Sequence, residues 1–170
     1  MRTGLKYAAR FSVIPAAAVL ALGLGGCSAL SGIFGQSAAR DADSQEITAP
    51  GSADVFTLRV GDCFDDNSET EISDVPGVPC ANPHDNEVYY TFQMPEGDYP
   101  GKAAITAAAE EGCVPQFESF IGISYSDSKL DWFPLTPLED GWNSLNDREI
   151  VCAAYDPDGK VTGSLAGVAR

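Results

Sequence analysis

A histidine and a cysteine lie four residues apart in the stretch PCANPHDNEV, residues 79–88. His84 is the only histidine of the chain, and Cys80 is one of five cysteines. At this spacing the two side chains could form a thiolate nucleophile with its base, or half of a metal site. In the alternative interpretation Cys80 is bonded to another cysteine and both residues are structural. The compartment in which the segment folds bears on the choice, because disulfides persist mainly outside the cytosol.

Residues 1–26 have the features of a secretory signal. Three basic residues precede an uncharged apolar run over residues 11–24, which is shorter than the roughly 20 residues that span a bilayer. The run leads into LGGCS, which resembles the lipobox of bacterial lipoproteins. That resemblance implies cleavage before Cys27 and acylation of its thiol. We therefore predict a signal peptide over residues 1–26 and a protein anchored by lipid at Cys27 to the extracytoplasmic face of the cell membrane.

The charge balance excludes several partners. The chain has ten basic and 25 acidic residues, and three of the basic residues lie in the predicted signal. Seven basic residues then remain, so the processed chain carries a net charge of −18. Such a chain is repelled by nucleic acid and by anionic lipid headgroups. We expect no nucleic-acid partner, and we expect the lipid to provide the contact with the membrane.

The composition divides the exported part into two regions. Residues 27–53 are rich in small and polar residues, and their few large apolar residues have no sustained period. Such a stretch buries too little surface to offset the loss of chain entropy, so it is predicted to be a flexible, lipidated tether. Residues 54–167 are predicted to fold as one domain of ordinary size.

Without Cys27, an even number of cysteines remains in the exported domain, which favours two disulfides. These cysteines are Cys63, Cys80, Cys113 and Cys152. Three pairings are possible, and proximity along the chain favours Cys63 with Cys80 and Cys113 with Cys152. In that pairing Cys80 is neither a nucleophile nor a metal ligand. A structural zinc site would also need more clustered ligands than one histidine provides.

Periodicity predicts mostly strands around one helical region. Strands are predicted over residues 55–60, 87–94, 129–135, 149–155 and 161–167. The strand at 149–155 is apolar on both faces, which is typical of a central strand. An edge segment or extended loop is predicted at 72–80, a helix at 102–112, a second helical piece from Pro115, and a helical turn at 138–143. This order predicts an α+β fold, with a small, mostly antiparallel sheet, one helical layer and two disulfides.

Several short motifs recur together along the predicted domain. They are GDCF at 61–64, VPCANPHDNEV at 78–88, a helix leading to Cys113, a W…P pair at 132–134, GW…NDREIVC at 141–152, and GSLAG at 163–167. As a set they resemble the septum formation domain family of actinobacterial cell-envelope proteins, over about residues 55–167. The resemblance implies that the four cysteines of the domain are those of the family, and it implies a link to septum formation. Asn146 stands where the family typically has Gly, and the resemblance supplies no catalytic residues.

Five side chains are candidates for binding. They are His84, Asp85, Glu87, Trp132 and Trp142. His84 is interpreted as a turn residue, with a ligand contact and a catalytic base as alternatives, although no nucleophile turn of the G-x-S-x-G type is present. The tryptophans are interpreted as core packing, or as a carbohydrate platform if both are exposed together.

The leading hypothesis is a non-enzymatic binding module of the cell envelope, with no cofactor, no metal and no catalytic residue. Its expected partner is an envelope protein or a cell-wall polymer. The alternatives are an envelope hydrolase and a lipoprotein that binds a small ligand or a metal, each centred on His84.

Overall fold

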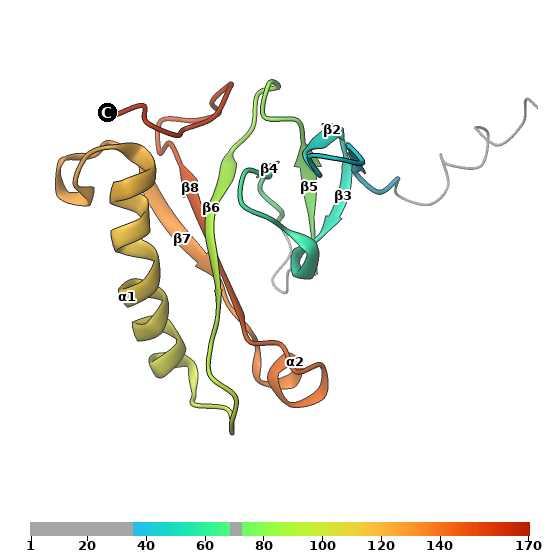
Figure 1. Cartoon of the computed structure of the whole chain (residues 1–170), viewed down its shortest axis with the longest axis vertical. Helices are drawn as coiled ribbons and strands as arrows, with labels where there is room; N and C mark the ends of the chain where they lie inside the picture. Colours follow the sequence, from blue (N-terminus) through green and yellow to red (C-terminus); the bar gives the residue numbers. More distant parts are fainter. Residues whose placement is uncertain (1–35, 69–72) are drawn as a thin grey trace, which may run out of the picture. The chain divides into compact units, whose positions relative to one another are not determined.

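The computed structural model describes residues 36–68 and 73–170, and its main feature is a six-stranded antiparallel sheet with the order β3-β5-β4-β6-β8-β7. Its strands are β3 (Gly51–Asp54), β4 (Cys63–Phe64), β5 (Asp74–Val78), β6 (Asn86–Gln93), β7 (Asp131–Leu135) and β8 (Glu149–Tyr155). The long helix α1 (Lys102–Ile121) runs beside β6, β7 and β8 (Figure 1). The predicted α+β fold with one main helix and two disulfides is confirmed.

Strand β8 separates two apolar cores. Ile150, Cys152 and Ala154 belong to the core that α1 covers, whereas Val151 and Ala153 belong to a second core on the other face of the sheet. This alternation follows from the two-residue period of a strand. It confirms the prediction that residues 149–155 form a central strand, which pairs with β6 on one side and β7 on the other.

Helix α1 is one continuous helix, so the predicted break at Pro115 is wrong. Its buried residues recur every fourth position: Ile105, Ala109, Cys113, Phe117 and Ile121. They pack on the sheet on both sides of the exposed proline, and this burial offsets the lost backbone hydrogen bond. The helix ends at Gly122, which has a left-handed backbone conformation.

Gly112 was predicted to stop the helix, but it lies within α1. A Cβ atom built on Gly112 would lie 2.6 Å from the ring of Phe92 on β6. The glycine therefore allows the helix to approach the sheet closely.

Strand β5 lies inside the sheet, between β3 and β4, although its proline predicted an edge segment or an extended loop. Pro76 lies one residue beyond the last β4–β5 pair, which joins Phe64 to Gly77. Its missing N–H therefore interrupts no pairing with β4. The carbonyl of Pro76 still accepts a hydrogen bond from Asp65 N at 2.9 Å.

Residues 55–60 do not form the predicted strand. Val55–Thr57 is a turn of 3₁₀ helix, η1, because the Asp54 side chain accepts the N–H of Phe56 at 2.8 Å. Only Leu58 of the predicted apolar face is buried, while Phe56 and Val60 are exposed. Local capping by Asp54 thus prevails over the alternating pattern.

The predicted tether is wrong for residues 36–53, and the predicted domain start at residue 54 moves with it. Strand β3 belongs to the main sheet, and β1 (Ala39–Arg40) pairs with β2 (Ile47–Ala49) in a small second sheet. The Arg40 guanidinium binds both oxygens of the buried Asp62 carboxylate at 2.6 Å. This contact with a distant residue orders a segment whose composition predicts disorder.

The predicted closing strand at 161–167 is also absent. Val161 forms one isolated bridge with His84, and the rest of the segment is irregular. The Glu87 carboxylate and single backbone hydrogen bonds hold this segment in place.

The predicted signal peptide and the acylated Cys27 lie outside the described residues. Within the described ranges, no helix has both the length and the hydrophobicity needed to cross a bilayer.

The Arg40–Asp62 pair generates a stability prediction. Arg40→Ala should lower the free energy of unfolding by about 2–3 kcal/mol, because Asp62 would keep a buried charge without its partner. Lys160→Ala, which breaks partly exposed pairs with Asp65 and Asp85, is the matched control and should cost less than about 1 kcal/mol. Urea unfolding followed by tryptophan fluorescence measures both. Equal losses in the two variants would show that the N-terminal segment is not held by this pair.

Candidate functional site

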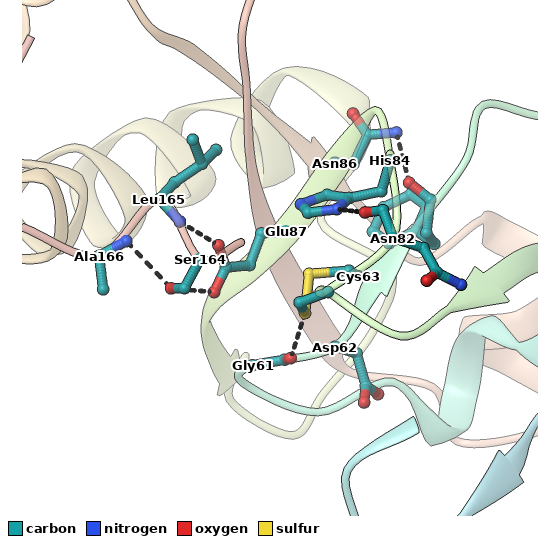
Figure 2. Close-up of a disulfide and its surroundings, with 12 residues drawn as sticks. Gly61, Asp62, Cys63, Asn82, His84, Asn86, Glu87, Ser164, Leu165 and Ala166 are labelled. Atoms are coloured by element: carbon teal, nitrogen blue, oxygen red, sulfur yellow. Dashed lines mark hydrogen bonds between the residues drawn. A yellow bond between two sulfur atoms is a disulfide. The ribbon is translucent and has the colours of Figure 1, made fainter. Parts of the chain in front are cut away.

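The residues of the PCANPHDNEV motif gather around the Cys63–Cys80 disulfide (Figure 2). Cys63 comes from β4, Cys80 from the turn after β5, and Glu87 from β6, directly opposite Cys63 in the sheet. His84 lies between them in sequence and bridges to Val161. The structure therefore brings the cysteine and histidine of the motif together with a carboxylate.

Both predicted disulfides are present, which leaves no free thiol in the described domain. Cys63–Cys80 closes a loop with a sequence separation of 17, and Cys113–Cys152 closes one of 39. From loop entropy alone, these bridges stabilise the domain by roughly 3 and 4 kcal/mol. Cys80 Sγ also lies 3.3 Å from the carbonyl oxygen of Gly61, a packing contact since a disulfide sulfur has no proton.

A metal site does not fit this arrangement. Donor atoms of Cys63, Cys80 and Glu87 lie within 4.8 Å of one another. The two sulfurs are bonded to each other, however, and provide no thiolate. Only the carboxylate remains as a strong ligand, and one carboxylate does not hold a structural metal ion.

His84 is fully buried and serves the local backbone. Its Nδ1 lies 2.9 Å from the carbonyl oxygen of Asn82, and since a carbonyl oxygen only accepts, Nδ1 is the donor of this hydrogen bond. Its main chain exchanges two hydrogen bonds of 2.9 Å with Val161. Within the described ranges, Nε2 is buried and has no hydrogen-bond partner. A general base must reach a substrate proton, and this nitrogen is not accessible to one.

Glu87 is also buried, and its two carboxylate oxygens hold the C-terminal segment. One oxygen accepts from Ser164 Oγ at 2.7 Å, and the other accepts from Leu165 N at 2.6 Å (Figure 2). In a serine hydrolase triad the histidine stands between the serine and the acid. Here the serine binds the acid directly, so Glu87 clasps the chain rather than orienting a base.

Asp85 points to the surface, unlike its two neighbours in the motif. It accepts a hydrogen bond from Asp66 N at 3.0 Å and lies 3.4 Å from Lys160 Nζ. Lys160 Nζ also lies 2.7 Å from Asp65, and this hydrogen bond raises the pKa of Lys160. The group is a partly exposed ion-pair network that joins two loops.

The two tryptophans do not form a platform, so the carbohydrate interpretation is wrong for this pair. Trp142 is buried, its indole N–H donates to Gly97 O at 2.8 Å, and the Arg148 guanidinium lies 3.8 Å from the centre of its ring. Trp132 is half-buried on β7 beside α1. Core packing, the other interpretation, describes Trp142 well.

A concave surface that the motifs did not indicate lies elsewhere. Its walls come from η1, the end of β7, the short helix α2 (Glu139–Ser144) with its following loop, and the start of β8. We call this the α2 cleft. Its volume is about 770 Å³, and Phe56, Leu138 and Leu145 are exposed along it. The sequence predicted Phe56 to be a strand residue and indicated no role for Leu138 and Leu145. The local pattern of apolar residues does not show which of them remain exposed to solvent in the folded domain.

Comparison with protein families identifies the region that contains both disulfides. A family model described as septum formation covers residues 60–169. Neither a curated protein nor a solved structure has significant similarity to the chain. The matched region begins after η1 and contains both disulfides and the whole PCANPHDNEV motif.

His84 generates a test of its structural role. His84→Ala should lower the free energy of unfolding by about 2–3 kcal/mol, because it leaves a cavity and an unpaired carbonyl at Asn82. His84→Asn is the matched variant and should lose less, since its side-chain amide can donate to the same carbonyl. Chemical denaturation measures both. Unchanged stability in His84→Ala would contradict the scaffold role.

Glu87→Ala should loosen the C-terminal segment. It removes both carboxylate oxygens, so the buried Leu165 N–H and the Ser164 hydroxyl lose their acceptor, at a cost of about 2 kcal/mol. Amide hydrogen exchange at Leu165 should accelerate, and it reports this opening directly. Ser164→Ala, which spares the Leu165 N–H bond, should leave that exchange nearly unchanged. Fast exchange at Leu165 in the unmodified protein would contradict the clasp.

Proposed function

The chain belongs to the septum formation family, and on that premise we propose that it is a lipid-anchored, non-enzymatic binding module on the extracytoplasmic face of the cell membrane. Two disulfides support the extracytoplasmic location, because such bonds are rare in the cytosol. The family match and the disulfides together identify an envelope module. A contribution to septum formation is the role that the family description suggests.

One observation favours binding over catalysis: the PCANPHDNEV motif uses its reactive groups internally. His84 and Glu87 are buried and hold the backbone of neighbouring segments, and Cys80 is in a disulfide. A hydrolase centred on His84 would need an accessible imidazole and an adjacent nucleophile. His84 is fully buried, and Cys80, the candidate nucleophile of the motif, is bonded to Cys63.

The proposed anchor rests on the N-terminal part of the sequence. The basic, apolar start of the chain and the LGGCS stretch support cleavage before Cys27 and acylation there. Two or three acyl chains would bind the membrane stably, whereas one chain binds marginally. Eight residues, 28–35, lie between Cys27 and Gln36, where the described domain begins. A fully extended chain of that length reaches at most about 30 Å, so the proposed anchor keeps the domain close to the membrane.

Replacement of the acylated residue tests the anchor. Cys27→Ser should abolish labelling with a radioactive fatty acid and should prevent cleavage of the signal, since the thiol accepts the lipid. Labelling in cells followed by membrane fractionation measures both effects. Cys63→Ser, which removes a disulfide cysteine of the domain, should retain the label. Equal labelling of Cys27→Ser and the unmodified chain would place the lipid elsewhere.

A further inference from the structure

The α2 cleft is lined by three large apolar side chains that are exposed to solvent. Phe56, Leu138 and Leu145 are 50%, 51% and 69% exposed, and all three line the cleft. They come from η1, from the residue before α2 and from the residue after it. Large apolar side chains exposed around one concavity are typical of a protein interaction site.

These three side chains are not part of the apolar cores of the domain. The buried anchor of α2 is Trp142, which lies on the α1 side and packs against Tyr99 and Arg148. Leu138 and Leu145 flank that helix and remain open to solvent. The floor between them and η1 is partly buried Leu135 of β7 and buried Val151 of β8. The cleft therefore has a fixed base on the sheet and exposed apolar walls.

The charges around the cleft are mainly negative. Glu139, Asp140, Asp147 and Glu149 line it, whereas Lys102 is its only lysine or arginine. None of these four carboxylates forms an ion pair with a described residue. Burial and the neighbouring Asp147 raise the pKa of Glu149. A cation placed in the cleft would relieve this repulsion.

We propose that the α2 cleft binds an envelope protein through a cationic peptide segment, whose apolar side chains insert among Phe56, Leu138 and Leu145. The inference rests on the proposed function, and it names the surface and the chemistry of the partner. The negative rim disfavours anionic lipid, nucleic acid and anionic wall polymer for the same electrostatic reason. The apolar walls disfavour a purely polar basic ligand, which would leave them exposed. A peptide that combines lysines with leucines satisfies both conditions.

Binding of a synthetic peptide to the intact processed protein tests the proposal. The probe is a fluorescent 14-residue peptide of lysine and leucine, and the comparison peptides replace all lysines by glutamate or all leucines by serine. Fluorescence anisotropy should detect binding of the lysine–leucine peptide only. Leu138→Ser with Leu145→Ser should weaken that binding at least tenfold. Glu139→Gln with Asp140→Asn should weaken it about threefold to tenfold and reduce its dependence on salt.

Matched variants away from the cleft control for surface changes of the same kind. Val168→Ser removes an exposed apolar residue of the C-terminal segment, and Glu111→Gln removes an exposed acid of α1. Both should leave binding unchanged. All the cleft positions that are replaced are exposed, so thermal unfolding should stay within a few degrees of the unmodified protein. That measurement separates a lost contact from a lost fold.

Three outcomes would overturn the proposal. The first is no binding of the lysine–leucine peptide, or binding that the cleft variants do not change. The second is equal binding of the glutamate peptide. The third is a dimer in analytical ultracentrifugation that Leu138→Ser with Leu145→Ser dissolves, since a second copy of the chain would then occupy the cleft.

A crosslinking experiment in membranes separates this proposal from the proposed function. If photo-crosslinking recovers the same envelope protein with the unmodified chain and with the leucine variant, the chain is a binding module but the cleft is not its surface. If the leucine variant alone loses that crosslink, the cleft proposal is supported. Recovery of no crosslinked protein, together with no peptide binding, would overturn both.

Discussion

The Cys63–Cys80 disulfide joins β4 to the turn after β5. Residues beside it bind the N-terminal and the C-terminal segments of the domain. Next to Cys63, Asp62 binds Arg40 of the N-terminal segment. The carbonyl of Cys80 accepts the N–H of Gly163 at 2.7 Å, and Glu87, opposite Cys63, holds Leu165. The bridge restricts the unfolded chain, while the neighbouring buried polar groups each require a specific distant partner. The N-terminal and C-terminal segments of the domain are therefore both held by contacts around this disulfide.

This region also explains why the only imidazole of the chain is not a reactive group. His84 lies where the backbone must turn from the disulfide loop into β6, and its ring bonds to Asn82 O. A buried polar group is stable when its partners lie within the protein, and such a group is not available to a substrate. Catalytic and binding groups need the opposite arrangement. The surface that we propose for recognition is the α2 cleft, which is built by η1, α2 and the end of β7.

Predictions from the sequence succeeded where local pattern and burial agree. The apolar run at residues 149–155 correctly predicted a central strand that is buried on both faces, because such a strand needs apolar side chains on each face. Predictions failed where a specific contact prevails over the pattern. Asp54 caps η1 in a segment that alternates like a strand, and Arg40 finds Asp62 from a segment with the composition of a linker. Pro115 is tolerated because α1 is buried on both sides of it.

The sequence by itself determined the number of cysteines available for pairing, the strongly acidic charge, the order of β6, α1, β7 and β8, and the membership suggested by the spaced motifs. Only the tertiary structure decided which polar residues are buried and which apolar residues are exposed. The sequence indicated His84 and Glu87 as candidate site residues, yet both are buried. It indicated no role for Leu138 and Leu145, yet both are exposed. The physical reason is that burial depends on which distant segments pack together, and the local period of the sequence does not specify those segments.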